Sequence, residues 1–334
     1  MAKARSAAAP HAPERFAGPG AGLFFGALCA LNGAFVPAVA RLTTERGDPF
    51  FVAAATTAFA GVTAGVVLAA RGELGWLARR GSAGTLAVLG LLGTALPFLL
   101  FFAGTQRTSA IEAVLCLQME PVYSLLLAWG VLGHRLTLRR LSAAALLASG
   151  VFLAVGVGRG PRGDALGLGL LMVTPLCWQL SHVLVLRRLP GTPAPVLTGA
   201  RYVWGAIFLA PALWLSPAGP GDLPLREQLP ILALQGVVLA YAGTMFWYLA
   251  IGRLDLARAT AVVVPSIPVL SLGVSYLLLG EQASLRQLAG TALTVVGVVA
   301  FARAPHAVSE RERIPAPSAP IAVPVEPEEG GDAA

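Results

Sequence analysis

Charged side chains are scarce in this sequence. Asp, Glu, Lys and Arg make up only 12% of its 334 residues, against roughly a quarter in soluble proteins. Hydrophobic residues make up 56%, and apolar runs recur from about residue 20 to residue 303 with only short polar breaks between them. This pattern excludes a water-soluble fold and predicts a protein that crosses the membrane several times.

Cysteine and histidine are also rare, with three and four residues. Cys29, Cys116 and Cys177 each lie inside an apolar run, so neither a disulfide framework nor a metal site is expected. The sequence has no H-E-x-x-H motif, no nucleophile motif and no G-x-x-x-x-G-K-[ST] loop. An intramembrane enzyme and an ATP-driven pump are therefore disfavoured, and we expect no cofactor.

The apolar runs predict an all-α membrane protein with ten transmembrane helices. A bilayer core roughly 30 Å thick requires about 20 mostly apolar residues per helix. Clusters of Arg, Asp, Gly and Pro separate runs of about this length, and we expect the spans near 20–40, 51–70, 83–103, 108–132, 138–157, 165–186, 197–215, 230–250, 256–279 and 286–303.

The basic residues indicate the orientation of these spans. With the N-terminus inside, the inner loops and tails carry 16 Lys and Arg and the outer loops carry 7, with Arg201 left at the mouth of the seventh span. The positive-inside rule therefore predicts that both termini are cytoplasmic. It also accounts for the net charge of +7 without nucleic acid as a partner.

Both tails are predicted to lie outside the membrane. Residues 1–19 contain no early apolar stretch or cleavage site, so we expect a cytoplasmic tail and not a signal peptide. Residues 304–334 are rich in Pro, Ala and Glu without apolar periodicity, which is typical of a disordered tail.

The two halves of the sequence match each other at an offset of 147 residues. Pro121 aligns with Pro268, Leu132-Gly133 with Leu279-Gly280, and Gly150-Val151 with Gly297-Val298. The match predicts a duplication, with repeats at 20–157 and 165–303. Each repeat would hold five spans, an odd number, so the second repeat would be inverted relative to the first. Inverted repeats are a feature of secondary transporters.

The segments 108–150 and 256–297 resemble the end of an EamA repeat of the drug/metabolite transporter superfamily. In that family a proline in the fourth or ninth helix precedes a Leu-Gly-Glu turn and a closing helix with a late glycine. Leu279-Gly280-Glu281 has this turn, whereas His134 replaces the acidic residue in the first half. The resemblance implies a ten-helix carrier that exports or exchanges a small metabolite and has no ATP-binding domain.

Two acidic residues, Glu112 and Glu120, lie inside the fourth predicted span. A charged side chain at a helix centre costs about 2.5 to 3.5 kcal/mol even on the lenient insertion scale, so such residues usually face the protein interior. Either carboxylate could bind a proton or an amino group of a substrate. The alternative is structural: Glu112 would reach the headgroup region, and Glu120 would pair with a polar group of a neighbouring helix.

Prolines and further polar residues complete the candidate site. Pro121 leaves a backbone carbonyl free one turn earlier, and a helix break there would line a cavity; Pro265 and Pro268 offer the same break in the ninth span, with a packing kink as the alternative. The side chains expected to surround a shared central ligand site with Glu120 are Asn32, Gln179, His182, Tyr241 and Tyr248.

Several questions stay open from the sequence alone. The spacings Gly22/Gly26 and Gly61/Gly65 permit close helix contacts, either within the bundle or in a homodimer. A channel is the other membrane function considered, but the acids lack counterparts in the second half, which favours a carrier. Arginine-rich, lysine-poor composition suggests a bacterial plasma membrane, with lipid, a small-molecule substrate and optionally protons as partners.

Overall fold

The computed structural model describes residues 19–304, except residues 134, 157–163, 217–218, 220–223, 252 and 255. Every regular element within these ranges is a helix. The tails predicted at 1–19 and 304–334 lie almost wholly outside the described residues, as does His134.

The chain up to Val155 forms five helical segments of membrane-spanning length. The first two are α1 (Pro19–Thr44) and α2 (Pro49–Ala70), which is followed by the short 3-10 helix η2 (Leu74–Ala78). The third is a continuous rod formed by α3 (Ala83–Gly90), the π-helical η3 (Leu91–Ala95) and α4 (Leu96–Arg107). The fourth is interrupted and consists of α5 (Ala110–Leu117) and α6 (Glu120–Gly130), and the fifth is α7 (Leu138–Val155).

The rest of the chain repeats this order of elements. It contains α8 (Ala165–Arg188), α9 (Ala194–Leu209) followed by the single turn α10 (Ala212–Leu215), a continuous rod of α11 (Leu225–Ala233), the π-helical η4 (Leu234–Ala242) and α12 (Gly243–Ile251), then α13 (Leu256–Leu279) and α14 (Leu285–Arg303).

Nine helices of the described part are long and apolar enough to cross a membrane. Within α13 the segment Val263–Leu279 is an additional, shorter apolar helix. The protein is thus a helical multi-pass membrane protein, as its composition predicts.

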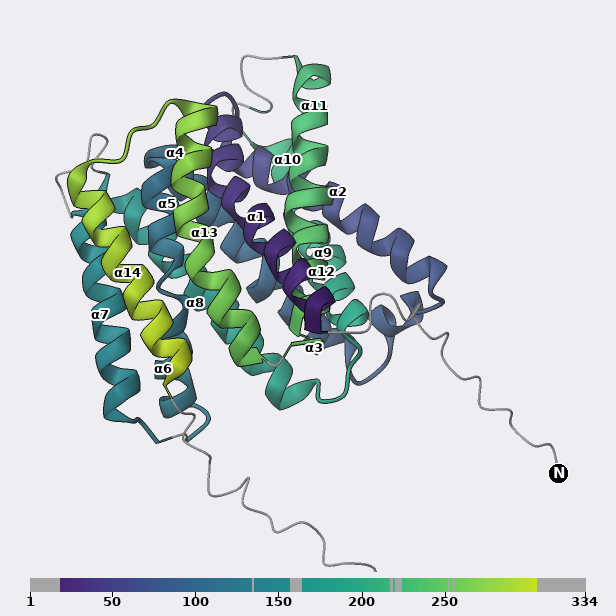
Figure 1. Cartoon of the computed structure of the whole chain (residues 1–334). Helices are drawn as coiled ribbons and strands as arrows, with labels where there is room; N and C mark the ends of the chain where they lie inside the picture. The colour runs from purple at the N-terminus through teal and green to yellow at the C-terminus, as the bar shows by residue number, and fades with distance from the viewer. Residues whose placement is uncertain are drawn as a thin grey trace, which may run out of the picture.

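Helices α7 and α14 lie side by side along one edge of the bundle (Figure 1). Their backbones approach closely at glycines: a Cβ added to Gly150 would lie 2.5 Å from the amide nitrogen of Thr294, and one added to Gly297 would lie 2.5 Å from the amide nitrogen of Leu147. Residue numbers rise along α7 as those of the contacting residues fall along α14. The two helices therefore run antiparallel.

The π-helical segments occupy matching positions in the sequence. Adding the offset of 147 to the bounds of η3 gives 238–242, which is the end of η4. Single π-helical turns are rare and are often found at functional sites, because the shifted hydrogen bonds leave backbone carbonyls free for other partners. Both rods therefore change their hydrogen-bond pattern at the same point of the repeat.

The prolines behave differently in the two halves. The fourth span is interrupted between Leu117 and Glu120, where Pro121 stands at the start of α6. In contrast, α13 continues through Pro265 and Pro268, so the helix break predicted there is absent. Packing of α13 along α1, including contact of Ile267 with the position of Gly33, supports a continuous helix despite two missing backbone donors.

The small-residue pairs pack mainly inside the bundle. A Cβ on Gly22 would meet the side chain of Leu254 at 2.6 Å, and one on Gly61 would meet Ala206 at 2.8 Å. Gly26 has Val263 at 3.4 Å, while nothing lies within 4 Å of the equivalent position on Gly65. Three of these four glycines therefore serve helix contacts within one chain.

The glycine contact between α7 and α14 predicts a difference between two Gly→Ala changes. Gly150→Ala should destabilise the protein by about 1–3 kcal/mol, because the new methyl group would overlap the backbone of α14. Gly273→Ala in α13 is the matched control, since no atom lies within 4 Å of its added Cβ. Thermal unfolding in detergent should give a lower Tm for Gly150→Ala only; equal values would contradict this packing.

Candidate functional site

Glu120 lies at the middle of the fourth span. It is the eleventh of the 21 residues in Ala110–Gly130 and the first residue of α6, directly after the interruption of the helix. Proline at the next position suits a helix start, since its missing N–H would have no intrahelical acceptor there. The break therefore places a carboxylate at the middle of the span.

The side chain of Glu120 contacts the sixth span. Nε2 of Gln179 in α8 donates a hydrogen bond of 2.6 Å to Oε1 of Glu120. Both side chains are half-buried. The structure thus brings together two of the residues that the sequence predicted at the site, and the acid has a neutral amide as its hydrogen-bond partner.

Arg201 is a functional candidate that the sequence analysis placed incorrectly. It was expected at the mouth of the seventh span, but it is the eighth of the 16 residues of α9. Its Nη2 donates a hydrogen bond of 2.6 Å to the carbonyl oxygen of Gly93 in η3. Thr192-Pro193, a helix-start signal, precedes α9 directly and would have placed Arg201 inside the membrane.

Arg201 lies in the same region as the predicted site. Its charge interacts with Glu120, His182 and the hydroxyl group of Tyr202. No ion pair between Arg201 and a carboxylate forms among the described residues. We call Glu120, Gln179, His182, Arg201 and Tyr202 the central polar cluster.

Tyr202 joins this cluster to the eighth span. Its hydroxyl group donates a hydrogen bond of 2.8 Å to the carbonyl oxygen of Ala240 and lies 2.8 Å from Oγ1 of Thr244. Its ring packs edge-on against that of Tyr241, with 6.1 Å between centroids. The predicted Tyr241 therefore borders the cluster through Tyr202, which the sequence analysis did not select.

Asn32 contacts the second π-helical segment. Its Nδ2 donates a hydrogen bond of 2.8 Å to the carbonyl oxygen of Val238 in η4, and its Oδ1 lies 2.5 Å from the position of a Cβ added to Gly243. Gln179, its counterpart at the 147-residue offset, binds Glu120 instead. The two equivalent amides thus differ in partner, and the contacts of Asn32 are those of a residue that supports η4.

Glu112 stabilises the start of its own helix. Its carboxylate accepts a hydrogen bond of 3.0 Å from the amide of Ser109, whose hydroxyl group accepts one from the amide of Glu112. Glu281, the acid of the Leu-Gly-Glu turn, accepts further hydrogen bonds from the amides of Ala110 and Ile111. Two carboxylates therefore accept hydrogen bonds from backbone amides at the start of α5. Their negative charge also stabilises the positive end of the helix dipole.

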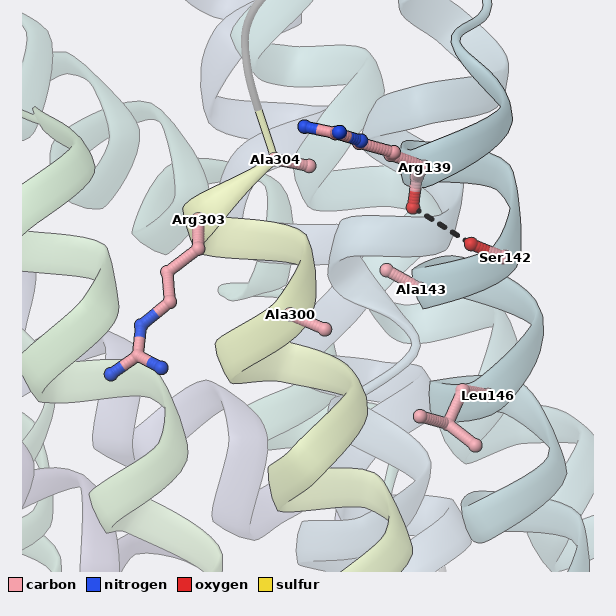
Figure 2. Close-up of a pocket in the computed structure, with 7 residues that line it drawn as sticks. All are labelled: Arg139, Ser142, Ala143, Leu146, Ala300, Arg303 and Ala304. Carbon is pink, nitrogen blue, oxygen red and sulfur yellow. Dashed lines mark hydrogen bonds between the residues drawn. The ribbon is translucent and has the colours of Figure 1, made fainter.

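A hollow of about 490 Å³ lies away from these residues, between α7 and the end of α14. Figure 2 shows Leu146, Ala143 and Ala300 along its sides, Arg139 above it, and the side chain of Arg303 directed away. Its lining contains no acidic residue, and it belongs to the outer edge of the bundle. We therefore assign the candidate site to the central polar cluster.

Metal binding has no comparable support in the described part of the chain. There, no three His, Cys, Asp or Glu side chains gather in a group that could hold a metal ion. The chemistry available to the central polar cluster is hydrogen bonding, charge pairing and protonation.

Comparison with known proteins identifies the family. The model of the EamA-like transporter family matches residues 20–156 and again residues 165–303. This chain belongs to the EamA-like transporter family. It contains two EamA repeats, and membership in this family indicates transport and not catalysis as its role.

Relatives and a solved structure agree with this membership. The chain is 27% identical over 228 residues to a "probable terminal-alkyne amino-acid exporter" of Streptantibioticus cattleyicolor, covering 65% of this chain and 72% of the exporter. It is 26% identical over 216 residues to an uncharacterised transporter of Archaeoglobus fulgidus, covering 64% and 76%. A crystal structure with 22% identity and a TM-score of 0.59 covers 84% of this chain and 96% of its own, which supports the fold.

The capping contacts predict that Glu112 acts on stability. Glu112→Ala should lower the free energy of unfolding by about 0.5–2 kcal/mol, because the amide of Ser109 loses its acceptor. Glu112→Gln should keep most of the stability, since Gln287 makes the same bond at the start of α14, where its Oε1 accepts from the amide of Ser284 at 2.9 Å. Thermal unfolding tests both variants, and an unchanged Tm in Glu112→Ala would contradict a capping role.

Proposed function

We propose that this protein is a secondary transporter that moves a small metabolite or drug-like compound by alternating access between two inverted five-helix halves. In this proposal ten helices cross a bacterial plasma membrane and both termini are cytoplasmic. Transport is outward and is driven by exchange or by coupling to protons.

The arrangement of equivalent helices supports the inversion. At the offset of 147 residues α7 corresponds to α14, and these two helices pack antiparallel. An odd number of spans per repeat gives the same result, since the second repeat then enters the membrane from the opposite side. Sites of such carriers lie near the midplane, between the repeats.

The observation that carries the proposal is the contact between Glu120 and Gln179. It joins an acid of the first repeat to an amide of the second repeat at 2.6 Å, at the middle of the fourth span and beside a broken helix. A carboxylate in that position can bind a proton or a positively charged group of the substrate in one state and release it in another. Protonation would also change its hydrogen bond with the amide.

The other predicted residues would take two kinds of role. His182, Tyr241 and Tyr248 would present hydrogen-bonding groups and ring surfaces around the ligand. The sequence predicted Asn32 and Glu112 as substrate-binding residues, but their contacts with η4 and the start of α5 favour a role in supporting the helices around the site.

The direction and substrate class have their support in the relatives. One similar protein is named as an exporter of an amino acid, which makes amino acids and compounds of similar size the first class to test. Glu120 has an apolar counterpart, Ile267, in the second repeat, so the site is asymmetric, as expected of a carrier that binds one substrate molecule between its halves.

The predicted topology gives a labelling experiment. Single cysteines at Ser6, Arg79 and Ser318, in a chain without Cys29, Cys116 and Cys177, should react with an impermeant maleimide only after the membrane is opened. A cysteine at Arg46 should react from outside in intact cells. Reaction of the two tails from opposite sides would refute the even number of spans, and with it the inverted arrangement.

The proposed role of Glu120 predicts the effect of its neutral analogue. Glu120→Gln should lower the transport rate by about 10- to 100-fold, as expected for the loss of one charge-assisted interaction, and should remove the pH dependence of transport. Transport into proteoliposomes measured over a range of pH values tests this. Glu112→Gln is the control, with wild-type rate and pH profile expected; if Glu120→Gln also matches wild type, Glu120 is structural.

A further inference from the structure

Arg201 is a positive charge inside a membrane span. It is the eighth of the 22 residues in Ala194–Leu215, and its hydrogen-bond partner Gly93 lies near the centre of the third span, the eleventh of the 25 residues in Ala83–Arg107. The side chain therefore does not reach to a headgroup region. An arginine at this depth is costly and generally has a functional partner.

The contacts of Arg201 use only part of its hydrogen-bonding capacity. A guanidinium group has five N–H donors. Nη2 binds the Gly93 carbonyl oxygen, whereas Nε is buried and without a hydrogen-bond partner, and Nη1 has no partner among the described residues. The side chain as a whole is half-buried, so part of it remains accessible.

The π-helical turn η3 holds the guanidinium group in place. A Cβ added to Gly93 would lie 2.8 Å from Nε of Arg201, which shows that the side chain lies directly against the glycine backbone. Gly93 and its carbonyl group in η3 thus orient Arg201 from one side and leave its Nη1 end open. A neutral donor would be enough to form a hydrogen bond with the Gly93 carbonyl group. The full charge of Arg201 is therefore not explained by this contact.

The charges of the central polar cluster are opposite but separate. Glu120 is near enough to Arg201 for an electrostatic interaction, but its hydrogen bond is with Gln179. Among the described residues, no carboxylate forms an ion pair with Arg201. A fixed positive group and a negative group that does not pair with it are together complementary to a compound that carries both charges.

We propose that Arg201 binds a carboxylate group of the transported compound through its open Nη1 end, while the Glu120–Gln179 pair receives the ammonium group of the same compound. The substrate is thus a small zwitterion. This inference rests on the proposed transport function, and it adds the chemical class of the substrate and the residue that selects it. Planar guanidinium groups bind carboxylates more tightly than neutral donors do.

Binding to the full-length protein in lipid nanodiscs tests the proposal without requiring transport. The probes are two series with a shared side chain: L-phenylalanine, L-phenylalaninamide, hydrocinnamate and phenethylamine, and L-leucine, L-leucinamide, isocaproate and isoamylamine. Titration calorimetry should give at least one zwitterion whose Kd for the wild-type protein is about 10- to 100-fold lower than that of its amide. Equal affinities of acid and amide, or no binding in either series, would overturn the proposal.

Variants identify the residue that reads each charge. Arg201→Gln should raise the Kd of the zwitterion about 10- to 100-fold and leave that of the amide unchanged. For Arg201→Lys, the Kd of the zwitterion should lie between the values for the wild type and Arg201→Gln. Gly93→Ala should have a smaller effect of the same kind, because its methyl group displaces the guanidinium group, whereas Gly84→Ala in the same rod meets no atom within 4 Å and should bind as wild type. An equal loss for zwitterion and amide would refute the role of Arg201.

The outcome can be separated from that of the proposed function. Counterflow of the bound zwitterion in wild-type proteoliposomes reports whether the protein is a carrier. If counterflow occurs but Arg201→Gln keeps the preference for acid over amide, the transport function stands and the role of Arg201 falls. If a zwitterion binds through Arg201 without counterflow, the site stands and the transport function falls.

Discussion

A bilayer offers no water to unpaired polar groups, and this constraint shapes every part of the molecule that departs from a plain apolar helix. At the middle of the fourth span the helix stops at Leu117 and starts again at Glu120, and the Glu120 carboxylate accepts a hydrogen bond from Gln179 of a neighbouring helix. In the third and eighth spans carbonyl groups of the π-helical segments accept hydrogen bonds from Arg201 and Asn32. Irregular backbone in this protein is therefore found where polar side chains from other helices meet it.

Close packing of small residues holds these polar groups at fixed positions. Between apolar helices in lipid there is little hydrophobic gain, so association depends on backbone approach and van der Waals contact. Gly150 and Gly297 allow this approach between α7 and α14, and Gly61 allows it between α2 and α9. These contacts give the outer helices a stable frame around the central polar cluster.

The two repeats share a frame but differ in the residues that carry charge. Glu120 corresponds to Ile267, and Arg201 corresponds to Ala54, so each repeat contributes one charged residue to the central polar cluster where the other has an apolar one. The turn residue Glu281 caps the start of α5, whereas the matching position in the first repeat is His134. Duplication thus accounts for the helices and close contacts, and later divergence of single residues accounts for the site.

The sequence by itself determined the membrane class, the positions of most spans, the 147-residue repeat and the helix break at Pro121, because each depends on local composition or on spacing along the chain. Tertiary structure decided which polar residues meet. Asn32 and Gln179 are equivalent in sequence but bind different partners, Glu112 caps its own helix, and α13 continues through Pro265 and Pro268 because α1 packs along it. Arg201 was misplaced because its depth depends on where α9 begins, and its partner Gly93 lies 108 residues away; contacts at that separation follow from helix packing and leave no local pattern in the sequence.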